Sequence, residues 1–100
     1  MWILDKIISR NYTIKFEEIS EEWLELKRNT IKQSTYYKYA YCIDKYLKDR
    51  VEKLKKKDLE KYDYNQMTNE LTKELSPKSV KEILNVLKSI LKYANQKYSM

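Results

Sequence analysis

The fold is decided by residues 76–97, which read SPKSVKEILNVLKSILKYANQK. A serine followed by proline favours a helix start, because the hydroxyl accepts from an unpaired amide and proline is tolerated at the first helical position. A capping-box pattern at Ser79-x-x-Glu82 leaves open a start three residues later. The stretch predicts a helix to about Lys97. Its apolar residues recur at helical spacing along one face: Val80, Ile83, Leu84, Leu87, Ile90, Leu91 and Ala94.

An earlier helix is predicted from about Ile14 to Arg28, because apolar residues again fall three and four positions apart. Five glutamates occupy much of its remaining surface, and Asn29 is a plausible left-handed stop after it. Trp23 is at the middle of the stripe, so we expect it to be buried against the last helix. The stripe consists of Phe16, Ile19, Trp23 and Leu26.

A second helix is predicted from Ser34 to Asp49, with Ser34 as its N-cap. A connector from Arg50 to Lys57 follows, and Val51 and Leu54 are its expected buried anchors. The helix residues expected to face the core are Tyr36, Tyr39, Ala40, Ile43, Tyr46 and Leu47.

A third helix, the least regular of the four, is predicted from Asp58 to Leu75. Residues 1–13 have no clear period and are interpreted as an N-terminal arm or linker before a single domain at 14–100. The whole pattern predicts an all-α fold. The third helix should bury Leu59, Tyr62, Met67, Leu71 and Leu75.

Composition excludes several classes of function. The chain has 100 residues, one cysteine (Cys42), no histidine and no glycine. Zinc sites, nucleophile–histidine pairs and glycine-rich phosphate loops therefore have no residues to form them. We expect no catalytic site, no metal and no cofactor, and a packing role for Cys42. No run of about 18 apolar residues suggests a membrane span, so a cytoplasmic protein without membrane contact is expected.

Charge is distributed unevenly along the chain. The total is +6, from 21 lysines and arginines against 15 acidic residues. Residues 1–33 are balanced, whereas residues 76–100 hold five lysines against Glu82 alone. A basic end on a balanced domain is a mild indication of nucleic-acid binding. Solubilising lysines are the competing explanation.

Two predicted helix starts carry groups that could hold DNA phosphates. A helix N-terminus exposes unpaired amides and a positive dipole end, to which hydroxyls and lysines add further donors. The second and fourth helices both show this pattern, although an ordinary cap beside solvated lysines would look the same. The residues concerned are Lys32, Ser34, Thr35, Tyr36, Lys38 and Tyr39 at the second helix, and Ser76, Lys78, Ser79 and Lys81 at the fourth.

A lysine row continues along the fourth helix. Lys81, Lys88 and Lys92 are seven and four residues apart, opposite the apolar face. Such a row can follow a phosphate backbone, or it can simply be a solvated face. The basic run at 53–57 is interpreted as a solvated loop.

The order of these motifs resembles the core-binding domain of the tyrosine recombinase, or phage integrase, family. The pattern Phe16-x-x-Ile19-x-x-x-Trp23-Leu24 is followed by Ile31-x-x-Ser34-Thr35-x-x-x-Tyr39-x-x-x-Ile43. The piece from Leu75 to Ala94 is similar to the family's last helix, so the resemblance covers about residues 14–98. It departs in two ways: Arg50-Val51-Glu52 has no glycine where the family's connector carries one, and no counterpart of the family's catalytic domain is expected in this sequence.

The resemblance implies a four-helix orthogonal bundle of the SAM-like kind, without the family's catalytic domain. It implies a DNA-binding domain that clamps duplex DNA at a crossover site during integration and recombination. The expected partners are double-stranded DNA, the parent protein's catalytic domain and other recombinase protomers, with the isolated domain a monomer. The DNA-facing residues would be those of the two helix starts from Lys32 to Tyr39 and from Lys78 to Lys81, together with Lys88.

Two other functions remain open. One is a helical protein-interaction module whose lysines only confer solubility. The other is a stand-alone helix-turn-helix repressor, which is disfavoured because that motif usually has a tight turn between two short helices, often with glycine.

Overall fold

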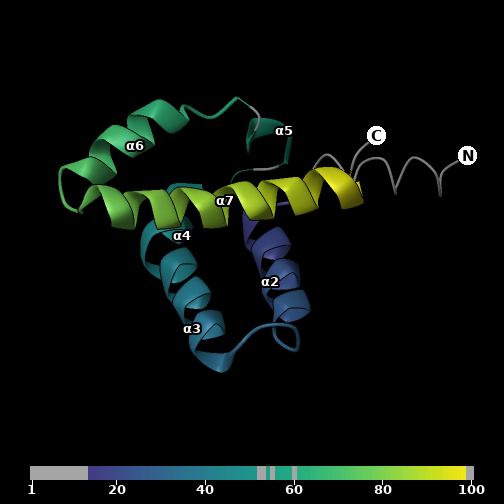
Figure 1. Ribbon diagram of the computed structural model, residues 1–100. Coiled ribbons are helices and arrows are strands. Elements are labelled where there is room, and N and C mark those ends of the chain that lie inside the picture. Colours follow the sequence, from purple (N-terminus) through teal and green to yellow (C-terminus); the bar gives the residue numbers. More distant parts are fainter. Residues whose placement is uncertain (1–13, 52–53, 55, 60, 99–100) are drawn as a thin grey trace, which may run out of the picture.

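The computed structural model describes residues 14–51, 54, 56–59 and 61–98, and the predicted arm at 1–13 lies outside them. The described part is all-α, as predicted. Its helices are α2 (Phe16–Lys27), α3 (Gln33–Cys42), the π-helical turn η1 (Ile43–Leu47), α4 (Lys48–Val51), α5 (Lys56–Leu59), α6 (Tyr64–Thr72) and α7 (Pro77–Tyr98) (Figure 1). Because α3, η1 and α4 are continuous and α5 is a single turn, the described residues form four principal helical segments, as predicted.

Two hydrogen bonds fix the start of helix α2. The Glu18 carboxylate accepts from the Lys15 backbone amide at 3.3 Å. The Phe16 amide donates to the carbonyl of Leu54 at 2.9 Å, so the expected anchor in the connector holds the start of this helix. The predicted left-handed stop at Asn29 is wrong. No described residue has a positive φ, and the chain instead leaves α2 through a turn closed by the Thr30 amide on the Lys27 carbonyl at 3.0 Å.

The second principal segment runs unbroken from Gln33 to Val51. Its N-cap is Lys32, without a side-chain cap, so the prediction that Ser34 is the N-cap is wrong. The reason is that the first helical hydrogen bond starts earlier, from the Tyr36 amide to the Lys32 carbonyl at 3.0 Å, which places Ser34 inside the first turn. At η1 the Lys48 amide donates to the Ile43 carbonyl, which is the i→i+5 pattern of a π turn.

The predicted third helix is two helices. The described residues 61–63 lie between α5 and α6, and the Asp63 carboxylate caps α6 by accepting from the Gln66 amide at 3.0 Å. The Tyr64 hydroxyl donates to the Leu59 carbonyl at 2.5 Å and so links the two helices across the break. The inward residues were nevertheless predicted correctly in the main: Leu59, Met67 and Leu71 are buried, and Tyr62 and Leu75 are partly buried.

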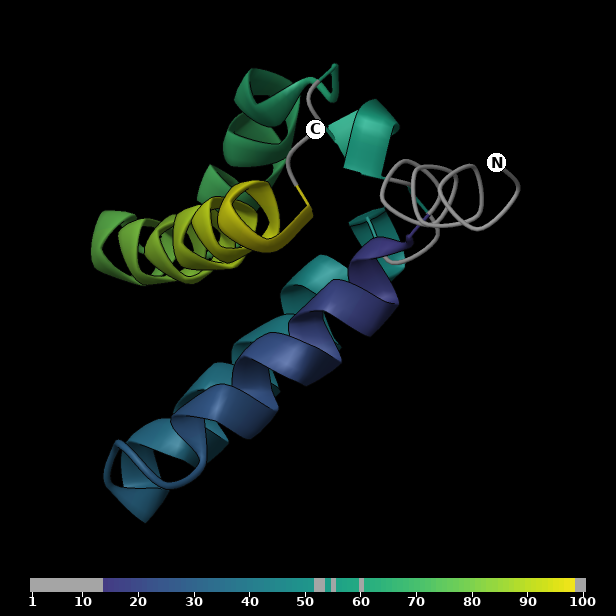
Figure 2. The same cartoon turned by 90° about the vertical axis from the view of Figure 1, so that its right-hand side faces the viewer.

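Helix α7 is the central element. It starts at Pro77 after Ser76, whose Oγ accepts from the Ser79 amide at 3.4 Å, so the first of the two predicted starts is confirmed. It contacts α6 on one side and α2, α3 and η1 on the other. Figures 1 and 2 show it running across the α2–α3 hairpin rather than along it. Its described length is 22 residues.

The core is formed where α7 crosses the other helices. Trp23 is buried as predicted, with 4% of its surface exposed. Its ring contacts that of Tyr39, with centroids 5.2 Å apart. Leu26, predicted to belong to the same stripe, is 57% exposed, and that prediction is wrong. The last turn of α2 extends away from α7 (Figure 1), so it lacks the helix that covers the earlier turns.

Candidate nucleic-acid interface

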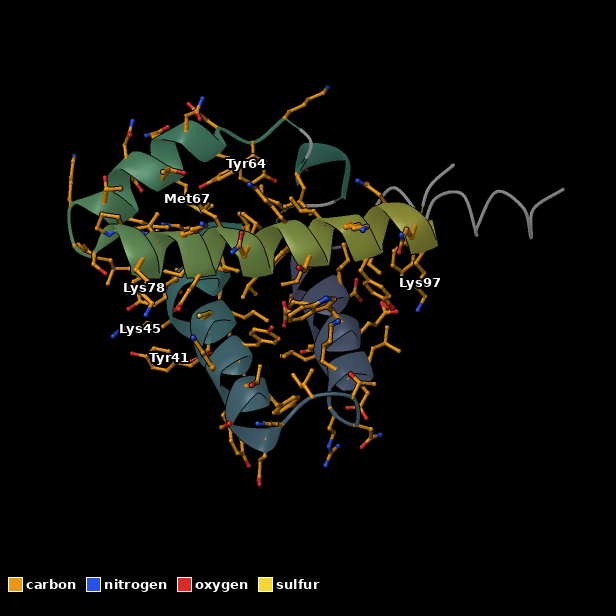
Figure 3. All side chains as sticks on the ribbon, viewed as in Figure 1. Tyr41, Lys45, Tyr64, Met67, Lys78 and Lys97 are labelled. Atoms are coloured by element: carbon orange, nitrogen blue, oxygen red, sulfur yellow. The ribbon has the colours of Figure 1, made fainter. Side chains whose placement is uncertain are left out.

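The predicted phosphate-binding residues lie at two separate places. The first turn of α3, with Lys32, Ser34 and Thr35, is at the tip of the α2–α3 hairpin, away from α7 (Figure 1). The first turn of α7, with Lys78, is at the corner next to α6 (Figure 3). Lys32, Ser34 and Lys78 are exposed. The structure therefore does not bring the two helix starts together.

Lys38 and Glu82 connect the two helices that carry these clusters. The Lys38 Nζ lies 3.2 Å from a carboxylate oxygen of Glu82. The side chains remain 55% and 38% exposed, and an ion pair in such a setting contributes at most about 1 kcal/mol. Lys38 can therefore exchange this carboxylate for a phosphate at little cost.

The remaining predicted residues differ in how accessible they are. Tyr39 is partly buried because its ring packs on Trp23. Thr35, Tyr36 and Ser79 are also partly buried. The Ser79 hydroxyl is engaged at the start of α7 by the hydroxyl of Ser76, at 3.2 Å. Lys81 and Lys88 are exposed. Of the predicted set, the lysines are the side chains that reach solvent most freely.

A groove follows α7 on the side of the α2–α3 hairpin. It consists of two adjoining depressions that share Trp23 and Ser89. We call it the α7 groove. Its α7 wall is lined by Glu82, Asn85, Val86, Ser89, Lys92, Tyr93 and Gln96. Its hairpin wall is lined by Trp23, Leu26, Lys27, Thr30, Lys38, Tyr39 and Cys42.

The charged side chains of this groove are mostly basic. Lys92, Lys27 and Lys38 line it, and Glu82 is the acidic residue among the lining side chains. Lys27 lies over the Trp23 ring, with Nζ 5.7 Å from the centroid. Because three lysines line the groove against one glutamate, the groove presents a net positive charge.

The other side of the hairpin has the opposite character. A second depression there has a largely apolar floor and is bordered by Glu17, Glu21, Asp44 and Lys48. Glu17, Glu18, Glu21 and Glu25 of α2 are exposed. A polyanion would be repelled from this side and attracted to the α7 groove.

Glu22 has a structural role that the sequence did not reveal. Its carboxylate accepts from the Tyr98 hydroxyl at 2.7 Å and from the Tyr93 hydroxyl at 3.5 Å, and it pairs with Lys97. The hydrogen bond to Glu22 raises the pKa of Lys97. Sequence reasoning assigned Glu22 to a solvated acidic face. Its position next to Trp23, at the border of the apolar stripe, was the one available signal that it faces another helix.

Two tyrosines of α3 are exposed on its outer face. Tyr37 and Tyr41, which lie outside the predicted core stripe of this helix, are 59% and 54% exposed. The Tyr37 hydroxyl accepts from the Gln33 amide at 3.2 Å, and the Tyr41 hydroxyl accepts from Lys45 Nζ at 2.8 Å (Figure 3). They form an exposed row on the outer face of α3.

Among the described residues, no three histidine, cysteine, aspartate or glutamate side chains lie close enough together to hold a metal ion. Cys42 is buried, and burial raises the pKa of its thiol. A raised pKa disfavours the thiolate, which is the nucleophilic form of cysteine. None of the described helices has both the length and the apolar character of a membrane span. The basic run at 53–57 lies largely outside the described residues.

Comparison with known protein families gives a match over the first part of the described residues. Residues 15–72 match the family described as phage integrase, N-terminal SAM-like domain. The matched region extends from the residue before α2 to the last residue of α6, which is more than half of the chain, and α7 follows it. Searches of curated proteins and of solved structures found no match.

Proposed function

The chain belongs to the family of phage integrase N-terminal SAM-like domains, and from this we propose that it is the non-catalytic DNA-binding domain of a tyrosine recombinase. Its role would be to hold duplex DNA at the crossover site during integration and recombination. Strand breakage and rejoining would be performed by a catalytic domain of the parent protein. Other protomers on the same DNA would be further partners.

The observation that carries this proposal is the charge of α7. Lys78, Lys81, Lys88 and Lys92 are all exposed, while the opposite side of the helix is buried in the core. A row of lysines on a rigid helix can neutralise several phosphates along one strand, with release of counterions. The α7 groove adds Lys38 and Lys27 beside this row, so the favoured ligand is a polyanion with an extended backbone.

We expect this chain to bind duplex DNA weakly, with an affinity that falls steeply as salt rises. The Lys81→Ala/Lys88→Ala double variant should lower the slope of log affinity against log salt by about two, since each lost phosphate contact lowers it by about one. Fluorescence anisotropy with a labelled duplex over a salt series measures both quantities.

A matched control separates the α7 face from net charge alone. Lys61 and Lys73 are exposed and lie beside α6, so Lys61→Ala/Lys73→Ala removes the same charge from another surface. The control should keep nearly the parent slope. Equal losses in the two double variants, or no affinity of the parent chain for any duplex, would contradict the proposal.

The two exposed tyrosines of α3, Tyr37 and Tyr41, favour a second candidate function, a helical protein-interaction module. Tyrosine is enriched where protein interfaces derive most of their affinity. This alternative predicts no salt-dependent duplex binding by the parent chain and loss of a protein partner in Tyr37→Ala/Tyr41→Ala.

A further inference from the structure

Asn85 occupies the centre of the exposed side of α7. Ala94, which is 1% exposed, follows it nine positions later in the helix. At about 100° per residue, this places the two side chains on opposite sides of the helix. Asn85 is itself exposed, and it lines the α7 groove together with Lys38 and Glu82.

Lysines flank Asn85 along the helix axis. Lys81 precedes it by four residues and Lys88 follows it by three, which corresponds to about 6 Å and about 4.5 Å along the axis. Both lysines are exposed. Their long side chains can reach sideways to the backbone phosphates of a duplex. The short Asn85 side chain can reach only what lies directly opposite the helix.

The chemistry of Asn85 differs from that of its neighbours. Its amide offers one acceptor and two donor hydrogens, and within the described residues it has no side-chain hydrogen bond. The nearby Glu82 carboxylate, paired with Lys38 at 3.2 Å, can accept hydrogen bonds but donates none. A neutral amide adds no charge to the lysine row, and its adjacent donor and acceptor match the major-groove edge of adenine.

We infer that Asn85 is a sequence-reading residue of this domain, contacting an adenine in the major groove while Lys81 and Lys88 hold the flanking phosphates. The inference rests on the proposed DNA-binding function and adds to it a residue that discriminates between base pairs. The lysines contribute affinity for every sequence. Asn85 contributes preference at one position.

The test is selection of duplexes from a random pool by the parent chain and by Asn85→Ala. The parent should enrich a motif that includes an adenine, and the variant should lose the preference at that position alone. Exchanging this adenine for guanine in a single duplex should weaken binding of the parent by about tenfold and leave binding of the variant unchanged. Lys81→Ala should weaken binding throughout and keep the motif.

Asn69→Ala on α6 is the control, because Asn69 is also an exposed helical asparagine. It should select the parent's motif. The inference is overturned if Asn85→Ala selects that motif too, or if the parent binds duplexes without preference for any base. Those results leave the proposed function standing. A parent chain that binds no duplex at all overturns the proposed function itself.

Discussion

At the scale of a single residue, Trp23 packs α2 into the core of the bundle. It is 4% exposed and contacts Tyr39 of α3. Trp23→Ala should lower the free energy of unfolding by about 3–5 kcal/mol, because a large side chain is removed from a closed core. Leu26→Ala, a change at an exposed position of the same helix, should cost less than about 1 kcal/mol. Denaturant melts measure both, and similar losses would show that Trp23 is not a core residue.

Tyr64 should make the stability of the fold depend on pH in the alkaline range. Burial, reinforced by the neighbouring Tyr62, raises the pKa of Tyr64 to about 12. The unfolded chain has the ordinary value of about 10. The folded state therefore holds this proton more tightly, and the contribution of Tyr64 to stability is complete below about pH 10 and lost as pH rises toward 12.

We expect Tyr64→Phe to be less stable than the parent near neutral pH by about 0.5–1.5 kcal/mol, since the hydrogen bond to Leu59 is lost. Between about pH 10 and about pH 12, the parent should lose more stability than the variant, because phenylalanine cannot ionise. Urea melts at intervals across this range test the prediction. A parallel decline in the two proteins would show that Tyr64 titrates normally in the fold.

At the scale of elements, the end of α7 depends on Glu22. Tyr98, which is 4% exposed, donates to this carboxylate from the last turn of the helix. Glu22→Ala should accelerate amide hydrogen exchange at 94–98 by roughly tenfold, because a hydrogen bond to a charged group contributes about 1.5 kcal/mol or more. Glu21→Ala, at an exposed neighbour, should leave exchange in that turn unchanged. Equal amide exchange in the two variants would show that Glu22 does not stabilise the end of α7.

Elements with strong periodicity were predictable, and those that depend on tertiary contacts were not. The seven apolar positions predicted for α7 are all buried or partly buried, and its start at Ser76-Pro77 was correct. The break between α5 and α6 was missed because the hydrogen bond from Tyr64 to Leu59 maintains it, without glycine or proline to mark the turn. The start of α3 was misplaced because its N-cap, Lys32, lacks a capping side chain.

The candidate site shows the same division. Exposure of Lys81 and Lys88 follows from helical spacing alone and was predicted correctly. The pairing of Lys38 with Glu82 and the groove between α7 and the hairpin depend on how two distant segments cross. No local pattern contains that information, so Asn85 and Glu22 were not singled out from the sequence.

At the scale of the whole molecule, charge separates the two sides of the hairpin. Exposed glutamates cover α2 away from α7, and lysines cover α7 and the adjoining groove. A domain divided in this way should orient itself on DNA before any specific contact forms, because the field favours a single approach.

Backbone amide shifts during an NMR titration with a short duplex test this account most directly. The account predicts that they concentrate at residues 78–92 of α7 and at Lys38 and Tyr39 across the groove, and that they shrink as salt is raised. Shifts concentrated at residues 17–25 of α2, or a spectrum that does not change on addition of DNA, would contradict it.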